Sequence, residues 1–170
     1  MKYLVMSDSH GDREIVYRVT EHFKNQVDYI IHCGDSELPS NEVIWQEVVV
    51  VTGNCDYDNG YQEVQIIHTP LDCIYVTHGH LSGVRMGITK LGLQAQEANA
   101  SIVLFGHTHE IGCEKVGQRL FLNPGSISFP RGRLNYQSFA IIESTDTSWD
   151  VQYYTRDFQP IKDLHFTFSK

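Results

Sequence analysis

Residues 1–11, MKYLVMSDSHG, decide how the rest of the chain is interpreted. The apolar run Tyr3–Met6 is typical of a short buried strand, and it is followed closely by Asp8-Ser9-His10. In open α/β sheets, ligand-binding groups collect at the carboxyl ends of the strands. Because side chains on extended backbone alternate between faces, we expect Asp8 and His10 to point the same way and to be able to hold one cation. The simpler alternative is an aspartate that opens a turn beside an ordinary histidine.

The same pattern, an apolar run that ends in ligand-type residues, recurs four more times. Residues 29–33, 48–51, 73–77 and 102–105 are predicted to be strands. They lead, in chain order, into Gly34-Asp35, Gly53-Asn54-Cys55-Asp56, His78-Gly79-His80 and Gly106-His107-Thr108-His109. The neighbouring glycines let the backbone turn sharply beside a ligand. Repetition at five strand ends, always with metal-compatible side chains, predicts a metal centre rather than five unrelated turns.

The distribution of elements predicts the fold class. A helix is expected over residues 12–23 with Asp12 as N-cap, a hairpin over residues 63–77, and a second helix over residues 83–99. Shorter strands are expected at residues 111–116, 120–122, 138–143 and 151–155. A parallel first half and an antiparallel second half favour an α/β (α+β) chain with two sheets packed face to face and helices outside. The apolar tail, residues 157–170, is expected to cover a sheet edge or a subunit interface.

Length and composition limit the classes of protein that fit. A chain of 170 residues, 41% hydrophobic and 20% charged, is expected to form one domain over residues 1–170. Its net charge of −8 argues against stable nucleic-acid binding through a basic surface. Four well-separated cysteines favour free thiols. We find no signal-peptide pattern and no apolar run that would span a bilayer, so we expect a cytoplasmic protein without membrane contact, with a homodimer or homotetramer left open.

The chemistry of the strand ends indicates which ions they would bind. Carboxylate, amide and imidazole ligands together suit Mn²⁺, Fe²⁺, Zn²⁺, Ni²⁺ or Co²⁺. Seven ligands are too many for one tetrahedral ion, and they suit two ions about 3.5–4 Å apart that share one carboxylate. Asp35, in the middle of the set, is the natural bridge. The seven candidate ligands are Asp8, His10, Asp35, Asn54, His78, His107 and His109.

Together, the five ordered blocks resemble the calcineurin-like metallophosphoesterase superfamily, in particular its small bacterial and archaeal phosphodiesterase branch. The resemblance runs from residue 4 to about residue 133. It implies a four-layer αββα sandwich of two mixed β-sheets flanked by helices. It also implies two divalent ions per chain, manganese first, with nickel, iron, zinc or cobalt as alternatives. One ion would take Asp8, His10, Asp35 and His109, and the other Asp35, Asn54, His78 and His107.

The resemblance also implies a mechanism, in which a hydroxide that bridges the two ions attacks phosphorus. Many superfamily members have a histidine at the position of Cys55, and that histidine is thought to protonate the leaving group. A cysteine, with an ordinary pKa of about 8.5, is a poor replacement acid. The role could pass to Asp56 or His80, the leaving group could need little protonation, or Cys55 could be a small buried filler. The candidate catalytic residues are therefore Asp35, Asn54, Cys55, Asp56 and His80.

Two arginines are candidates for contact with the substrate. Arg131, in the Pro130–Arg133 block, could hold a phosphate bidentately, and Arg85 is a weaker candidate of the same kind. Arg131 could equally be a solvated loop charge. The preceding Asn123-Pro124-Gly125-Ser126 block has the composition of a turn.

The function predicted from these features is that of a metal-dependent phosphodiesterase, a hydrolase that acts on a small phosphate diester. The alternative is a non-catalytic protein-binding scaffold, because the retromer cargo-recognition subunit shares the fold that the resemblance implies. A scaffold would be expected to carry bulky or apolar replacements among the ligands, whereas all seven are present here. A redox or thiol enzyme built on the cysteines lacks an activating motif.

Overall fold

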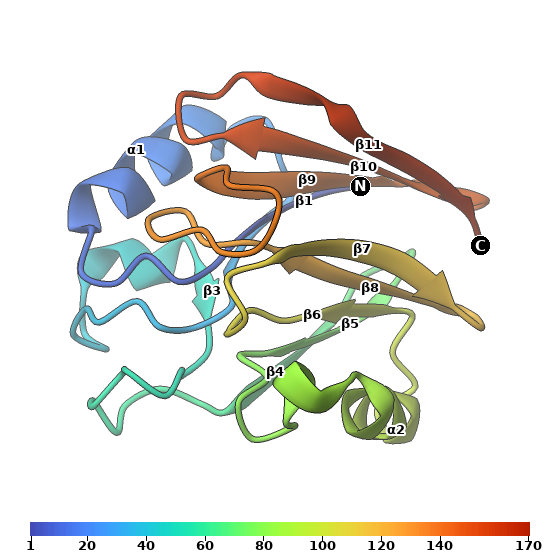
Figure 1. Ribbon diagram of the computed structural model, residues 1–170, viewed down its shortest axis with the longest axis horizontal. Coiled ribbons are helices and arrows are strands. Elements are labelled where there is room, and N and C mark those ends of the chain that lie inside the picture. Colours follow the sequence, from blue (N-terminus) through green and yellow to red (C-terminus); the bar gives the residue numbers. More distant parts are fainter.

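Figure 1 shows the computed structural model of the chain, which describes all 170 residues. The helical elements are α1 (Arg13–Phe23), α2 (Thr89–Glu97) and the 3-10 turns η1 (Val43–Gln46) and η2 (Val84–Met86). The strands are β1 (Lys2–Met6), β2 (Tyr29–His32), β3 (Val49–Val50), β4 (Val64–His68), β5 (Cys73–Thr77), β6 (Ile102–Leu104), β7 (Ile111–Val116), β8 (Arg119–Pro124), β9 (Ser138–Ser144), β10 (Ser148–Thr155) and β11 (Pro160–Ser169). Neither α-helix is long and apolar enough to cross a membrane.

The strands form two mixed sheets that lie between the helices. One sheet has the order β11-β10-β9-β1-β2-β3, and the other has the order β4-β5-β6-β8-β7. In the first sheet, β1 pairs in parallel with β2 and antiparallel with β9. Figure 1 shows α1 and α2 on opposite outer faces of the two stacked sheets. The predicted sandwich of two mixed sheets flanked by helices is confirmed.

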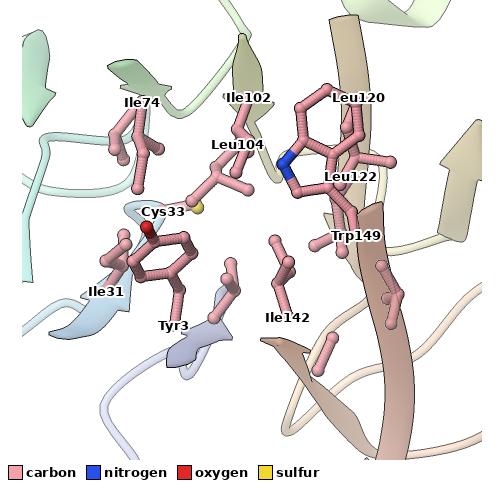
Figure 2. Close-up of a cluster of buried hydrophobic side chains, with 14 of the residues drawn as sticks. Tyr3, Ile31, Cys33, Ile74, Ile102, Leu104, Leu120, Leu122, Ile142 and Trp149 are labelled. Carbon is pink, nitrogen blue, oxygen red and sulfur yellow. The ribbon is translucent and has the colours of Figure 1, made fainter. Parts of the chain in front are cut away.

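Alternation of side chains along the strands builds the layers. In β1, Tyr3 and Val5 point between the sheets, whereas Leu4 and Met6 pack under α1. Inner-facing side chains of both sheets meet in a single cluster, which Figure 2 shows with Ile31 on one side and with Ile74 and Ile102 on the other. A corresponding outer cluster packs β5, β6 and β8 against α2. The central strands of both sheets are therefore buried on both faces, and for this reason their sequences are continuous apolar runs.

Several predicted elements differ from the observed ones. The helix expected over residues 83–99 is divided into η2 and α2 at Gly87, whose φ of 131° lies outside the helical region. The strand expected over residues 48–51 shrinks to β3. The two halves of the chain do not form separate sheets, since β9, β10 and β11 complete the sheet that β1, β2 and β3 begin. The expectation that the tail covers a sheet edge is met by β11, which pairs with β10.

At one end of the sandwich a buried carboxylate ties the two sheets together. Asp72 lies in the turn between β4 and β5, in one sheet, and accepts hydrogen bonds from Tyr3, Ser144 and Trp149 of the other. Lys170 lies 2.9 Å from the same carboxylate. Burial alone would raise the pKa of Asp72, but the hydrogen bonds from Ser144 and Lys170 hold that pKa below its ordinary value. The charged form of Asp72 is thus the one that the fold stabilises.

We predict that Asp72→Asn lowers the free energy of unfolding at pH 7 by about 3 kcal/mol, because the isosteric amide cannot satisfy the same donors. A carboxyl group whose pKa is depressed in the folded state contributes stability above its unfolded pKa of about 3.9 and loses that contribution as the pH falls through the folded value. Urea unfolding should therefore show the difference between wild type and variant shrinking below about pH 4. The exposed Asp146→Asn is the control and should change stability by less than about 0.5 kcal/mol. A pH-independent difference would contradict this role for Asp72.

Candidate metal centre

The carboxyl ends of five strands meet at one edge of the sandwich. β1, β2 and β3 run in parallel in one sheet, and β5 and β6 run in parallel in the other. The loops that follow them carry the seven candidate ligands. Four of these, Asp8, His10, Asp35 and His109, offer ligand atoms that all lie within 4.8 Å of one another. They are the four residues that the resemblance assigns to one ion.

The other three candidate ligands lie beside this group. Nε2 of His78 is 3.2 Å from Oδ1 of Asn54 and 3.4 Å from Oδ2 of Asp35. The His107 ring is 5.1 Å from the His78 ring, measured between centroids. Nε2 of His107 accepts a hydrogen bond from Nε of Arg85 at 3.0 Å. The structure therefore places the three remaining candidates beside the first group, with Asp35 next to His78, while Nε2 of His107 is directed to Arg85.

Backbone carbonyl groups fix the orientation of two of the histidines. Nδ1 of His78 donates to the carbonyl of Cys33 and Nδ1 of His109 donates to the carbonyl of Phe129, both at 2.7 Å. Because a carbonyl oxygen only accepts, the proton of each neutral ring lies on Nδ1 and the lone pair on Nε2. That lone pair then points at the oxygen atoms of Asn54, Asp35 or Asp8. Histidine nitrogens and side-chain oxygens that face one another with their lone pairs can all coordinate a cation bound between them.

The carboxylate of Asp8 has one oxygen left over for such a cation. Its side chain is fully buried, and Oδ2 accepts hydrogen bonds from Oγ of Ser7 and the backbone N–H of His107. Oδ1 accepts none, and the nearby Nε2 of His109, at 3.2 Å, is not placed as a hydrogen-bond donor. Asp35 is similar, since Oδ1 accepts from the backbone N–H of Cys55 while Oδ2 faces the histidines. A buried, unpartnered carboxylate oxygen is costly, so these residues fit divalent cations well.

The charges of the site act on one another. Burial by itself would raise the pKa of Asp8 and lower the pKa of His78 and His109, but the carboxylates raise the pKa of both histidines, and the protonated rings hold the pKa of Asp8 below its ordinary value. A dication between these groups would take the place of the Nε2 protons. The pKa of Asp35 is also depressed, chiefly by His78 acting against the effect of burial. Burial, with His78 and Arg85 nearby, lowers the pKa of His107 to about 4. At neutral pH the site therefore holds ionised carboxylates and a neutral His107, the forms that bind metal ions.

The backbone at the site is unusually bent. Positive φ angles, which few residues other than glycine adopt, occur at five of the seven candidate ligands: Asp8, His10, Asp35, His107 and His109. Each such residue costs about 1–3 kcal/mol and persists only where its surroundings hold it. Here the turns aim side chains from successive loops toward one point, which extended backbone would not do. The expected reason for Asp8 and His10 to share a face, alternation along a strand, is therefore wrong.

The Asn123–Ser126 block holds these loops in place. The Asn123 amide donates to the carbonyl of Gly106 at 2.9 Å, and the Ser126 hydroxyl donates to the carbonyl of Asp8 at 2.7 Å. The block thus braces the loops after β1 and β6 from behind. Its role is that of a support, and the turn that its composition predicts is wrong for its first half, because Asn123 and Pro124 belong to β8 and pair with β7.

A cleft of about 330 Å³ opens over the ligands. It is lined by His10, Asp35, Glu37, Asn54, Cys55, Arg85, His107, His109, Phe129 and Arg131. Both candidate arginines are thus in the wall of the cleft. Glu37 and Phe129 were not among the site residues predicted from the sequence. Of the two, only Glu37 lies near a predicted ligand in the chain, two residues after Asp35. The cleft is open and polar, and it matches a small anionic ligand better than a large apolar one.

The candidates for proton transfer differ in their access to the cleft. Cys55 lines it, and burial together with Asp35 raises the pKa of its thiol to about 11. Asp56 instead accepts from the backbone N–H groups of Asp35, Glu37 and Gly53, so its carboxylate is engaged in support. The other candidate, His80, is not among the lining residues, and its Nδ1 is buried without a hydrogen-bond partner.

Comparison with known proteins places the chain among phosphoesterases. A family model for the calcineurin-like phosphoesterase superfamily domain matches residues 1–147. "Probable metallophosphoesterase YsnB" of Bacillus subtilis is 35% identical over 164 residues, which cover 96% of each chain. Phosphodiesterase YfcE of Escherichia coli is 28% identical over 174 residues, which cover 85% of this chain and 88% of YfcE.

Solved structures show the same likeness. A protein of Streptococcus pneumoniae TIGR4, described as a predicted phosphoesterase, is 40% identical, with a TM-score of 0.97 over 99% of this chain and 97% of that one. Vps29 of Entamoeba histolytica, in a complex with zinc, has a TM-score of 0.70 over 99% of both chains. At 22% identity, this second likeness is one of fold alone.

We predict that Gly53→Ala weakens Mn²⁺ binding by about 10- to 100-fold in calorimetric titrations, the loss typical of disturbed support for ligands. A Cβ atom on Gly53 would lie 2.0 Å from Oδ1 and 2.4 Å from the backbone nitrogen of Asp35, so the aspartate must move. The control Gly112→Ala would meet only an ordinary contact of 3.9 Å and should bind as wild type does. Unchanged binding by Gly53→Ala would show that the position of Asp35 does not matter for metal binding.

Proposed function

This chain belongs to the calcineurin-like phosphoesterase superfamily, and we propose that it is a metal-dependent phosphodiesterase that hydrolyses a small phosphate diester. The observation that carries the proposal is the convergence of seven metal-compatible side chains beneath one open cleft. The relatives named as phosphoesterases and phosphodiesterases support the same reaction class. A cytoplasmic location and a homodimeric or homotetrameric state stay predictions.

We propose that two divalent ions bind at the strand ends, with Asp35 shared between them. Asp8, His10 and His109 would complete one ligand set, and Asn54, His78 and His107 the other. Two bound dications would supply Lewis acidity toward the phosphoryl oxygens and a hydroxide nucleophile near neutral pH. Manganese is our first choice among the ions that this ligand set suits, with nickel, iron, zinc and cobalt as alternatives.

The arginines in the cleft wall are suited to hold the substrate phosphate. Arg85 and Arg131 line the cleft and have no carboxylate within ion-pair distance, and Arg85 is held at the wall by hydrogen bonds to His107. In a chain with a net charge of −8, two guanidinium groups without acidic partners in one cleft favour an anionic ligand. We propose that Arg131 contacts a phosphate oxygen directly, as a bidentate donor.

The side chains nearest the leaving group favour an ester that needs little protonation. Cys55 is the one candidate proton donor that lines the cleft, because Asp56 is engaged by backbone N–H groups and His80 lies outside. Aryl oxygens leave as stable anions, whereas alkyl oxygens require a proton. We therefore propose that aryl phosphodiesters are good substrates and that Cys55 contributes little to their cleavage.

The decisive test is metal-supplemented hydrolysis of an aryl phosphodiester beside the matching monoester. We expect turnover of the diester with Mn²⁺, its loss on chelation, and a fall of at least about a hundredfold in kcat for Asp35→Ala. Asp157→Ala is the matched control, because its side chain is 78% exposed, and it should act as wild type does. Activity that survives chelation and Asp35→Ala would overturn the two-ion mechanism. Inactivity with every dication would favour the scaffold function of the same fold.

We also predict that Cys55→Ala changes kcat for an aryl phosphodiester by less than about threefold, because that leaving group needs no acid. Cys55→His, which restores the residue common in the superfamily, should raise kcat for an alkyl phosphodiester more than for the aryl one. The ratio of the two kcat values is the measurement. A large loss with Cys55→Ala on the aryl ester would make the thiol catalytically important.

A further inference from the structure

Three histidines of the centre are held through Nδ1, and only one of the three acceptors is a side chain. His78 and His109 donate to backbone carbonyls, which no substitution removes. Nδ1 of His10 instead lies 2.6 Å from Oε1 of Glu37, in a direct hydrogen bond. Since an ionised carboxylate only accepts, this contact keeps the proton of neutral His10 on Nδ1 and its lone pair on Nε2. That Nε2 lies 3.9 Å from Oδ2 of Asp35 and 3.2 Å from Nε2 of His109.

Glu37 is not a freely moving surface side chain. Its φ of 55° is unfavourable for a glutamate and has to be held by its surroundings. The backbone N–H of Glu37 donates to Oδ1 of Asp56 at 2.7 Å, while Oδ2 of Asp56 accepts from the backbone N–H groups of Asp35 and Gly53. One carboxylate thus places both the shared ligand and the glutamate. The Glu37 side chain then reaches the cleft wall, where it meets His10.

We propose that Glu37 is a positioning residue for His10, which it holds in the ring orientation and tautomer that bind the ion of the Asp8, His10, Asp35 and His109 set. Its negative charge would also make the imidazole a stronger donor, as carboxylates behind metal-bound histidines do. The inference rests on the proposed two-ion centre and adds a residue that acts on the ion through His10. A competing role is direct ligation, because His10, Glu37 and Cys55 also offer mutually close ligand atoms.

The test is calorimetric titration of the chelator-treated full chain with Mn²⁺. Wild type should bind two ions. Glu37→Ala should weaken one of the two by about 10- to 100-fold and leave the other within about twofold. Glu37→Gln should lose less than Glu37→Ala, because the amide oxygen still accepts from Nδ1. The control Glu110→Ala removes the same charge from an exposed residue next to His109 and should leave both affinities unchanged.

The His10 tautomer provides a second measurement. It is determined from long-range ¹H–¹⁵N spectra of the imidazole rings in the chelator-treated chain, before Mn²⁺ is added. The proton should be on Nδ1 in wild type and Glu37→Gln, and distributed over both nitrogens in Glu37→Ala. If Glu37→Ala left the affinities and the tautomer unchanged, or weakened the binding of both ions equally, the inference would be overturned but the proposed two-ion centre would not. Equal losses in Glu37→Ala and Glu37→Gln would identify Glu37 as a ligand and also overturn it. Wild type that binds fewer than two ions would overturn the proposed centre together with the inference.

Discussion

The constraint on which this structure depends is that lone pairs of buried acceptors converge on one point. Oδ1 of Asp8 has no donor, and Nε2 of His78 faces oxygens rather than hydrogens. Such an arrangement repels itself, so it must be held from outside. The carbonyls of Cys33 and Phe129 hold two rings, and Asp56 and the Asn123–Ser126 block hold the loops. Much of the polar network behind the cleft therefore serves to support the ligands.

The sandwich provides the rigid base for this support. Each central strand is packed on both faces, between the inner cluster and one of the outer helices, so the strand ends have little freedom to move. Asp72 fastens the two sheets to each other through Tyr3, Ser144 and Trp149. Since the candidate ligands come from both sheets, a fixed relation between the sheets is also a requirement of the centre. Stability and function are thus coupled through the same layers.

The fold alone does not separate an enzyme from a scaffold, because Vps29 has the same architecture at 22% identity. What favours catalysis in this chain is the site: strained backbone at five candidate ligands, an unpartnered buried carboxylate oxygen and a cleft with two arginines that lack acidic partners. The bent backbone is what turns these side chains toward one point. The proposed part played by Cys55 concerns the choice of leaving group and not the class of reaction.

Local sequence determined the strands other than β11, α1 with its Asp12 cap, and the identity of the side chains at the strand ends, because apolar periodicity and capping act over a few residues. The ordered motifs also sufficed for the family and the layered sandwich. Only the tertiary structure decided that β1 pairs with β9, that β11 is a strand, and that Glu37 meets His10 whereas Asp56 is engaged elsewhere. These outcomes depend on contacts between residues far apart in the chain and on left-handed backbone at the ligands, and neither leaves a periodic pattern in the sequence.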